Sequence, residues 1–313
     1  MAADGRFDYL LIESSGISEP LPVAETFTFI DPTVGALDDV ARLDTMVTVV
    51  DGVNFLRDYD GGRRIEADAP EDRRELSDLL VDQVEFADVI LVSKTDLTTS
   101  TRLDELTAVL RTLNPVAEIH PMEMGRVPLD RILDTGLFSL EKAANAPGWL
   151  RELRGTHLPE TEEYGVGSHV YRARSPFHPE RLHAFLAQEW TNGRLLRAKG
   201  YFWNAARVTA IGTISQAGHL IRHGYIGRWW RFIPDEYWPT DYRRDAITDK
   251  WDEMVGDCRQ EIVFIGQGID VDALVAQLDA CLLTDDEIGL GIDAWARFPD
   301  PLGDGETDKT PKS

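Results

Sequence analysis

The 313-residue sequence predicts an α/β protein in which a parallel sheet with helices on both faces precedes a smaller α+β domain. Two observations predict the sheet: short runs are apolar at every position, and amphipathic helical segments separate them. A third observation divides the chain, because residues 145–168 are rich in proline, glycine and acidic side chains. We therefore expect a first domain at 1–144, a linker at 145–168, a second domain at 169–298 and a disordered tail at 299–313.

The elements of the first domain follow from these patterns in order. Apolar runs predict strands at 9–12, 46–50 and 89–92. Leucines and valines at helical spacing predict helices at 75–86 and 103–113, and Asn114-Pro115 ends the second of them. A further short strand is expected at 117–120.

The second domain begins with a predicted strand and a helix that Pro179 starts. Two such β–α units around additional strands favour a ferredoxin-like arrangement. The remaining expected elements are strands at 195–203, 208–214 and 261–265, and a last helix at 271–283.

Composition excludes several classes of function. The net charge of −23 argues against a protein that binds nucleic acid through cationic phosphate contacts. The two cysteines, Cys258 and Cys281, form no Cys-x-x-Cys pair and indicate neither a disulfide framework nor a cysteine zinc site. The apolar runs are too short to span a membrane and the first residues are polar, so we expect a soluble cytoplasmic protein.

Two tetrapeptides carry the chemistry. Glu-Ser-Ser-Gly at 13–16 follows the first predicted strand, and Ser-Lys-Thr-Asp at 93–96 follows the third. In a parallel sheet both would face the crevice at the carboxyl ends of the strands. Asp96 could there accept hydrogen bonds from N1–H and the exocyclic amine of guanine, with the stem of Lys94 along the base. Either motif alone could be an ordinary turn or helix cap, but together they favour a GTPase-type nucleotide-binding domain.

The sequence also resembles a known family, the CobW-type P-loop GTPases, which include zinc metallochaperones and cobalamin-cobalt insertion proteins. The resemblance runs from IESSGISEPLPVAETF through VVDGVNF, ADVILVSKTDL and LNPVAEI. It continues in VYRARSPFHPERLHAFL, LLRAKGYFW, GTISQAG and GDCRQEIVFIG, in the branch whose core holds Trp203, Trp229 and Trp230. It implies an incomplete P-loop GTPase-type sheet followed by a CobW C-terminal domain.

Residue by residue, the resemblance implies five site residues. Glu13 would be the Walker B-like acid that holds Mg²⁺ directly or through water, and Gly16 would sense the γ-phosphate through its backbone amide. Lys94 and Asp96 would contact guanine. Ser93 replaces the family's usual asparagine, and its hydroxyl does not offer the amide's donors and acceptor.

The motif that wraps phosphates is missing. A P-loop needs Gly-x4-Gly-Lys-Ser/Thr, and none of the six lysines follows a glycine. Family members carry this loop and a Cys-x-Cys-Cys motif upstream of the Glu13 strand, so both would precede Met1. We expect a late start codon, a split or decayed gene, or a member that no longer turns over GTP, and hydrolysis by this chain alone is not expected.

Other candidate sites have simpler interpretations. His219 and His223 are spaced to share a helical face suited to zinc, but the glycines that bound GHLIRHG favour a surface loop instead. His157 in the acidic linker favours a solvated charge run. Arg197 and Lys199 could touch a client or nucleotide, but are more typical of the wet face of a strand. The tryptophans favour a core rather than a ligand cage, and His178 favours capping or packing at the helix start.

The leading hypothesis is a GTP-binding protein of the CobW family that delivers a metal, expected to be zinc, to a client metalloprotein. A nucleotide-dependent switch near 13–19 would control delivery, with GTP and Mg²⁺ as cofactors. The alternative is a non-catalytic interaction module or split-protein half that binds a client or a separately encoded P-loop segment. A P-loop ATPase is a distant third, which Asp96 disfavours. We expect no nucleic-acid or membrane partner, a possible homo-oligomer, and aggregation if a sheet edge is left unpaired.

Overall fold

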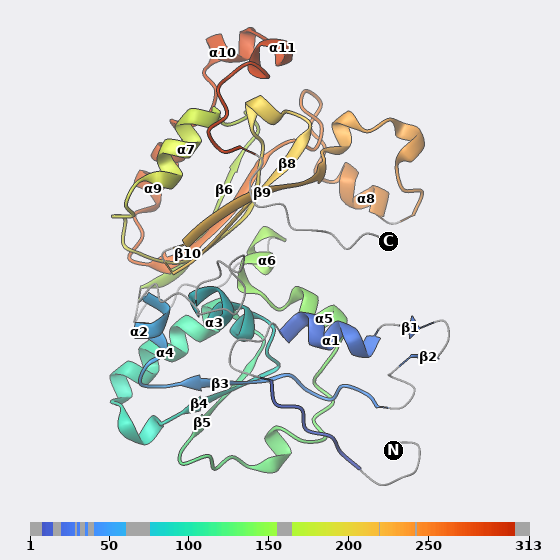
Figure 1. Cartoon of the computed structure of the whole chain (residues 1–313). Helices are drawn as coiled ribbons and strands as arrows, with labels where there is room; N and C mark the ends of the chain where they lie inside the picture. The colour runs from blue at the N-terminus through green and yellow to red at the C-terminus, as the bar shows by residue number, and fades with distance from the viewer. Residues whose placement is uncertain are drawn as a thin grey trace. The chain divides into compact units, whose positions relative to one another are not determined.

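The computed structural model describes residues 8–14, 20–28, 30–31, 35–36, 41–60, 76–154, 165–218, 220–241 and 243–303 (Figure 1). Two compact units are distinguished within the chain. One comprises Met1–Val166 with Ala217–His219, and the other comprises Gly167–Gln216 with Leu220–Ser313. Of the finer division made from the sequence, the boundaries at 144, 168 and 298 stay a prediction.

The first unit contains a three-stranded parallel sheet in the order β3-β4-β5. Its strands are β3 (Val47–Asp51), β4 (Val89–Ser93) and β5 (Glu118–Met122). Its helices are α1 (Pro20–Thr28), α2 (Phe55–Asp60), α3 (Leu76–Glu85), α4 (Ser100–Leu113), α5 (Leu140–Asn145) and α6 (Gly148–Leu153). A two-stranded antiparallel pair, β1 (Ile30–Asp31) and β2 (Gly35–Ala36), completes the elements that can be described.

The sheet and its helices confirm the α/β class predicted for this unit. The central strand β4 is buried on both faces, as its uninterrupted apolar run predicts. Helices α3 and α4 lie on the same side of the sheet in Figure 1, because right-handed crossovers that advance in one direction place their helices on one face. The Thr48 hydroxyl of β3 donates a hydrogen bond to the Gln83 carbonyl in α3 at 2.7 Å. This bond holds α3 against that face of the sheet.

The predicted strand at 9–12 is wrong: these residues form no strand. A strand needs a hydrogen-bonded neighbour, and β3, the nearest candidate in sequence, pairs only with β4 among the described strands. The segment is held at its start by the Tyr9 hydroxyl, which donates to Asp44 Oδ2 at 2.8 Å. Leu10, Leu11 and Ile12 are 68%, 79% and 54% exposed.

The second unit is built on a five-stranded sheet in the order β6-β10-β7-β8-β9. The strands are β6 (Val166–Ala173), β7 (Arg194–Phe202), β8 (Ala210–Ala217), β9 (Leu220–Arg228) and β10 (Gln260–Gln267). The helices are α7 (Pro179–Ala187), α8 (Arg243–Thr248), α9 (Val271–Asp279), α10 (Asp285–Gly289) and α11 (Ile292–Trp295).

The topology of this unit contains the β-α-β arrangement of the predicted ferredoxin-like fold. Strands β6 and β7, which α7 connects, are separated in the sheet by β10, and β10 pairs antiparallel with β7. This split β-α-β unit is the central feature of such folds. Strands β8 and β9 extend the sheet beyond it. Pro179 occupies the first turn of α7, as predicted, and the His178 ring stacks on Phe298 at 4.8 Å.

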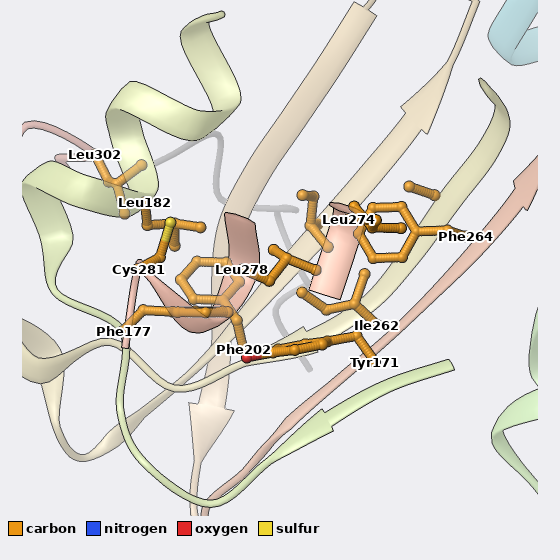
Figure 2. Close-up of a cluster of buried hydrophobic side chains, with 12 residues drawn as sticks. Tyr171, Phe177, Leu182, Phe202, Ile262, Phe264, Leu274, Leu278, Cys281 and Leu302 are labelled. Carbon is orange, nitrogen blue, oxygen red and sulfur yellow. The ribbon is translucent and has the colours of Figure 1, made fainter. Parts of the chain in front are cut away.

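The core of this unit lies between the sheet and helices α7 and α9, as Figure 2 shows. Aromatic and aliphatic side chains from both layers meet there, including Phe177, Phe202, Phe264, Leu274 and Leu278. A second cluster contains the buried Trp203 and Trp229, which confirms that these tryptophans belong to a core. Burial of this apolar area is the main stabilising contribution to the unit.

Four further expectations differ from the structure. Helix α6 and the first residues of β6 lie inside 145–168, because the helix is too short to leave a periodic signal. The region GHLIRHG, read as a loop or short helix, contributes to strand β9, so His223 lies on a strand; His219 lies outside the described residues. Arg197, expected on the solvent-exposed face of a strand, is only 2% exposed, and its guanidinium donates to the Gln216 carbonyl. In the predicted tail, Leu302 is buried and Asp300 pairs with Arg207.

No helix among the described residues is long and apolar enough to cross a membrane.

Candidate functional site at the end of strand β4

Strands β3 and β4 end side by side, and their last residues form the candidate site. The parallel register pairs Asp51 with Ser93, so the turns that follow the two strands lie at the same edge of the sheet. After Ser93, Lys94 adopts a left-handed backbone conformation with φ 58° and ψ 32°, and residues Thr95–Leu97 form a 3-10 turn. The Ser-Lys-Thr-Asp motif thus stands at the carboxyl end of the sheet, where ligands bind in open α/β folds.

Two hydrogen bonds join the ends of β3 and β4. The Gly52 amide donates to the Ser93 carbonyl at 2.9 Å, and the Ser93 hydroxyl donates to the Val50 carbonyl at 3.0 Å. A Cβ at Gly52 would lie 2.6 Å from the Ser93 carbonyl oxygen, so only glycine permits this approach. In this structure Ser93 therefore joins β4 to β3.

Lys94 pairs with Asp51, a residue outside the predicted site. Its Nζ donates to Asp51 Oδ2 at 2.7 Å. Asp51 Oδ1 also accepts from the amides of Val53 and Asn54, and its Oδ2 accepts from the Asn54 side chain at 2.8 Å. Burial opposes ionisation of Asp51, but these hydrogen bonds outweigh it and lower its pKa to about 2. The signal was present in the sequence, since Val-Val-Asp-Gly also ends an apolar strand.

Asp96 has the exposure that a base-reading carboxylate needs. It lies in the 3-10 turn, is exposed, and has no side-chain partner among the described residues. An exposed carboxylate can accept two hydrogen bonds from one ligand edge, and the stem of Lys94 offers an apolar surface two residues away. The residues present therefore fit a guanine base, and the roles of Ser93, Lys94 and Asp96 in binding it stay a prediction.

For the other two predicted site residues the described residues show no contact with this group. Glu13 is exposed in the unpaired segment that follows Tyr9. Gly16 lies outside the described residues. Roles for both in holding Mg²⁺ and sensing phosphate stay predictions.

The described part of the chain contains no group of three or more His, Cys, Asp or Glu side chains suited to a metal ion. The two cysteines are free and buried, and burial raises the pKa of Cys258 to about 12 and that of Cys281 to about 11. Thiols in this state are poor metal ligands and poor nucleophiles. His157, predicted to lie in a charge run, falls outside the described residues.

Comparison with known proteins accounts for both halves of the chain. Residues 1–121 match the sequence model of the CobW/HypB/UreG nucleotide-binding domain, and residues 166–282 match that of the cobalamin synthesis protein CobW C-terminal domain. The chain belongs to the CobW family. Over 310 residues, this CobW protein is 45% identical to the zinc-regulated GTPase metalloprotein activator 1 of Dictyostelium discoideum, covering 96% of the chain and 65% of that relative.

Two more relatives lie further away. A protein of Mycobacterium tuberculosis named a zinc chaperone is 28% identical over 301 residues, which are 93% of this CobW protein and 70% of the relative. Zn(II)-bound YjiA GTPase from E. coli is weakly similar in structure, at a TM-score of 0.33 and 17% identity, over 85% of the chain and 69% of YjiA. The chain thus spans about two thirds of the length of the Dictyostelium protein.

Proposed function

We propose that this CobW protein binds GTP and uses the nucleotide to control delivery of zinc to a client metalloprotein. The observation that carries the GTP part is the turn after β4, where a left-handed Lys94 precedes the exposed carboxylate of Asp96. The zinc part rests on the names of the Dictyostelium and mycobacterial relatives. Zinc is here the cargo, and the acceptor is a metalloprotein in the cytoplasm.

Guanine would be read by the edge that distinguishes it from adenine. Asp96 would accept from N1–H and the exocyclic amine, while the Lys94 stem covers the face of the base. Adenine presents no such donor pair and would leave the carboxylate unsatisfied. Mg²⁺, held by Glu13, would neutralise phosphate charge when bound. Gly16 would begin the segment that responds to the γ-phosphate.

A second function is favoured by one specific observation, an apolar surface in the first unit. Leu10 and Leu11 are exposed, and β3 is an edge strand among the described strands, with Val47 and Val49 38% and 59% exposed. Edge strands with exposed apolar side chains are sites for pairing with another chain. On this alternative, the protein is an interaction module that joins a client or a separately encoded P-loop segment, or a second copy of itself.

The test is calorimetric titration of the full chain with GTP, ATP and XTP in the presence of Mg²⁺. We expect GTP binding and no ATP binding. Asp96→Asn should weaken GTP binding about 10- to 150-fold, the value of a charge-assisted hydrogen-bond pair of about 1.5–3 kcal/mol. It should strengthen XTP binding, because the asparagine amide can donate to the 2-oxo group of xanthine.

Asp58→Asn is the matched control, since Asp58 is on α2 and pairs with Arg57 instead of facing the base. It should leave all three affinities unchanged. Absence of GTP binding by the unsubstituted chain would refute the proposal and favour the interaction module. A zinc titration with a competing chelator, with and without GTP, tests the cargo separately: equal zinc affinity in both would contradict nucleotide control.

A further inference from the structure

The left-handed conformation of Lys94 requires support from its surroundings. This conformation is unfavourable for a residue with a Cβ, and such residues gather at functional sites. In the described backbone only Lys94, Met124 and Asp134 combine a side chain with a positive φ. Two hydrogen bonds join the β3 and β4 turns, one between the Gly52 amide and the Ser93 carbonyl and one from the Ser93 hydroxyl to the Val50 carbonyl, but neither holds the Lys94 side chain.

Asp51 is placed to hold that side chain. Three of its four hydrogen bonds come from its own turn: the amides of Val53 and Asn54, and the Asn54 side-chain amide. These contacts orient the carboxylate whether or not Lys94 is present. The fourth position, on Oδ2, receives Lys94 Nζ at 2.7 Å. The Asp51 carboxylate is therefore an anchor that its own turn orients independently of Lys94.

Two consequences follow for the base site. A lysine side chain has many rotamers, and binding its ammonium to the end of β3 restricts the stem before any ligand arrives. The Lys94 side chain is still 48% exposed, so its stem can contact a base. The same tie also directs the cation to Asp51 and away from Asp96, two residues further along the chain. A lysine paired with Asp96 would neutralise the carboxylate that reads guanine.

We propose that Asp51 is a specificity-determining positioning residue of the guanine site, which holds the Lys94 ammonium at the end of β3 and leaves the Asp96 carboxylate for the base. This inference rests on the proposed GTP-binding function. It assigns a role to the Val-Val-Asp-Gly strand end and predicts that Asp51 acts through Lys94 without contacting the nucleotide.

The experiment is a double-mutant cycle on the full chain, with the affinity for GTP as the readout. Asp51→Asn keeps an oxygen for the amides of its own turn but removes the charge that attracts Lys94. Because exposed ion pairs are worth at most about 1 kcal/mol, we expect about fivefold weaker GTP binding. Lys94→Met keeps an unbranched stem without the ammonium. In that background Asp51→Asn should change the affinity less than about twofold.

The cycle separates positioning from a merely structural role. If Asp51 only shaped its turn, its substitution would weaken GTP binding equally in both backgrounds, which would overturn the proposal. Asp58→Asn removes the same charge from the same unit without touching Lys94 and should leave the affinity unchanged. Salt gives a second check: raising the ionic strength should shrink the effect of Asp51→Asn, because screening weakens an exposed pair.

A measurement without nucleotide distinguishes failure of this inference from failure of the proposed function. Acylation of lysines by an N-hydroxysuccinimide ester, followed by mass spectrometry, reports the reactivity of Lys94 relative to Lys142. We expect Asp51→Asn to accelerate acylation of Lys94 several-fold and to leave Lys142 unchanged. Equal rates at Lys94 would overturn the anchor. If the unsubstituted chain bound no GTP, the proposed function and the specificity role would fall together, and the acylation rates would still decide whether Asp51 holds Lys94.

Discussion

Asn114 should be among the residues that contribute most to the stability of the first unit. It is fully buried at the end of α4. Its side-chain amide donates to three backbone carbonyls at 2.8, 3.2 and 2.8 Å, those of Val84, Glu85 and Ala87. Its Oδ1 accepts from the amides of Val116 and Ala117 at 3.2 and 3.1 Å. One side chain thus connects the end of α3, the approach to β4 and the approach to β5.

The magnitude follows from these five bonds. Each contributes about 1 kcal/mol net, and a buried group left without a partner costs about 1–3 kcal/mol. Water and small backbone shifts would satisfy some of the groups in the variant, so the full sum is not reached. We expect Asn114→Ala to lower the free energy of unfolding of the first unit by about 3–5 kcal/mol.

Hydrogen exchange read by mass spectrometry measures this unit separately from the other. Peptides from 76–122 should lose protection in Asn114→Ala, while peptides from 194–228 should not. Asn192→Ala is the matched control: Asn192 makes two exposed hydrogen bonds with Asp270 in the second unit, and its loss should cost under about 1 kcal/mol. A change in protection of less than about fivefold across 76–122 in Asn114→Ala would refute the stability contribution assigned to these hydrogen bonds.

Three further outcomes are expected. Gly52→Ala should lower the melting temperature and weaken GTP binding, because its Cβ would meet the Ser93 carbonyl at 2.6 Å, whereas Gly289→Ala places its Cβ in open space and should be neutral; equal effects would contradict the close approach. The hydrogen bonds from Arg181 lower the pKa of Glu287 to about 2, so their stabilisation is present above the ordinary pKa of 4.5 and lost as pH falls towards 2. The melting temperature of Arg181→Gln should therefore lie below that of the unsubstituted chain at pH 7 and approach it at pH 3, and a constant difference would count against the pair. Both buried cysteines, whose pKa burial raises to about 12 and about 11, should react with a thiol reagent at pH 8 only after denaturant is added; rapid reaction of the native chain would show that they are accessible.

The sequence predicted those elements whose pattern is intrinsic. The run at β4 is apolar on both faces, and α4 repeats its leucines at helical spacing, so neither depends on a distant partner to be recognised. Strand β9 was missed because Leu220–Arg228 contains two glycines and three basic residues, and its strand character comes from pairing with β8. The reverse error occurred at 9–12, where a strand-like composition forms no strand pairing with the described residues.

Of the candidate site, the sequence predicted that Ser93, Lys94 and Asp96 follow the end of a strand, but not that Asp51 binds the Lys94 ammonium. Lys94 and Asp96 were predicted to contact guanine because a carboxylate can accept hydrogen bonds from the base and the lysine stem can lie along it. The Asp51 anchor was not selected, because its interest depends on the register that sets β3 beside β4. A short motif describes one strand end, whereas the site is made by two.

The contacts between the two strand ends also give Ser93 a structural role. Where the family usually has asparagine, serine offers a hydroxyl in place of the amide's donors and acceptor. In the structure the hydroxyl at this position donates to the Val50 carbonyl, and so it fastens one strand end to the other. A serine can make that bond as well as an amide can, because a single donor is enough. The exposed carboxylate of Asp96 is untouched by the exchange. The departure from asparagine therefore bears on how firmly the two turns are joined, and under the proposed function discrimination between guanine and adenine would rest on Asp96, with Asp51 holding the Lys94 ammonium.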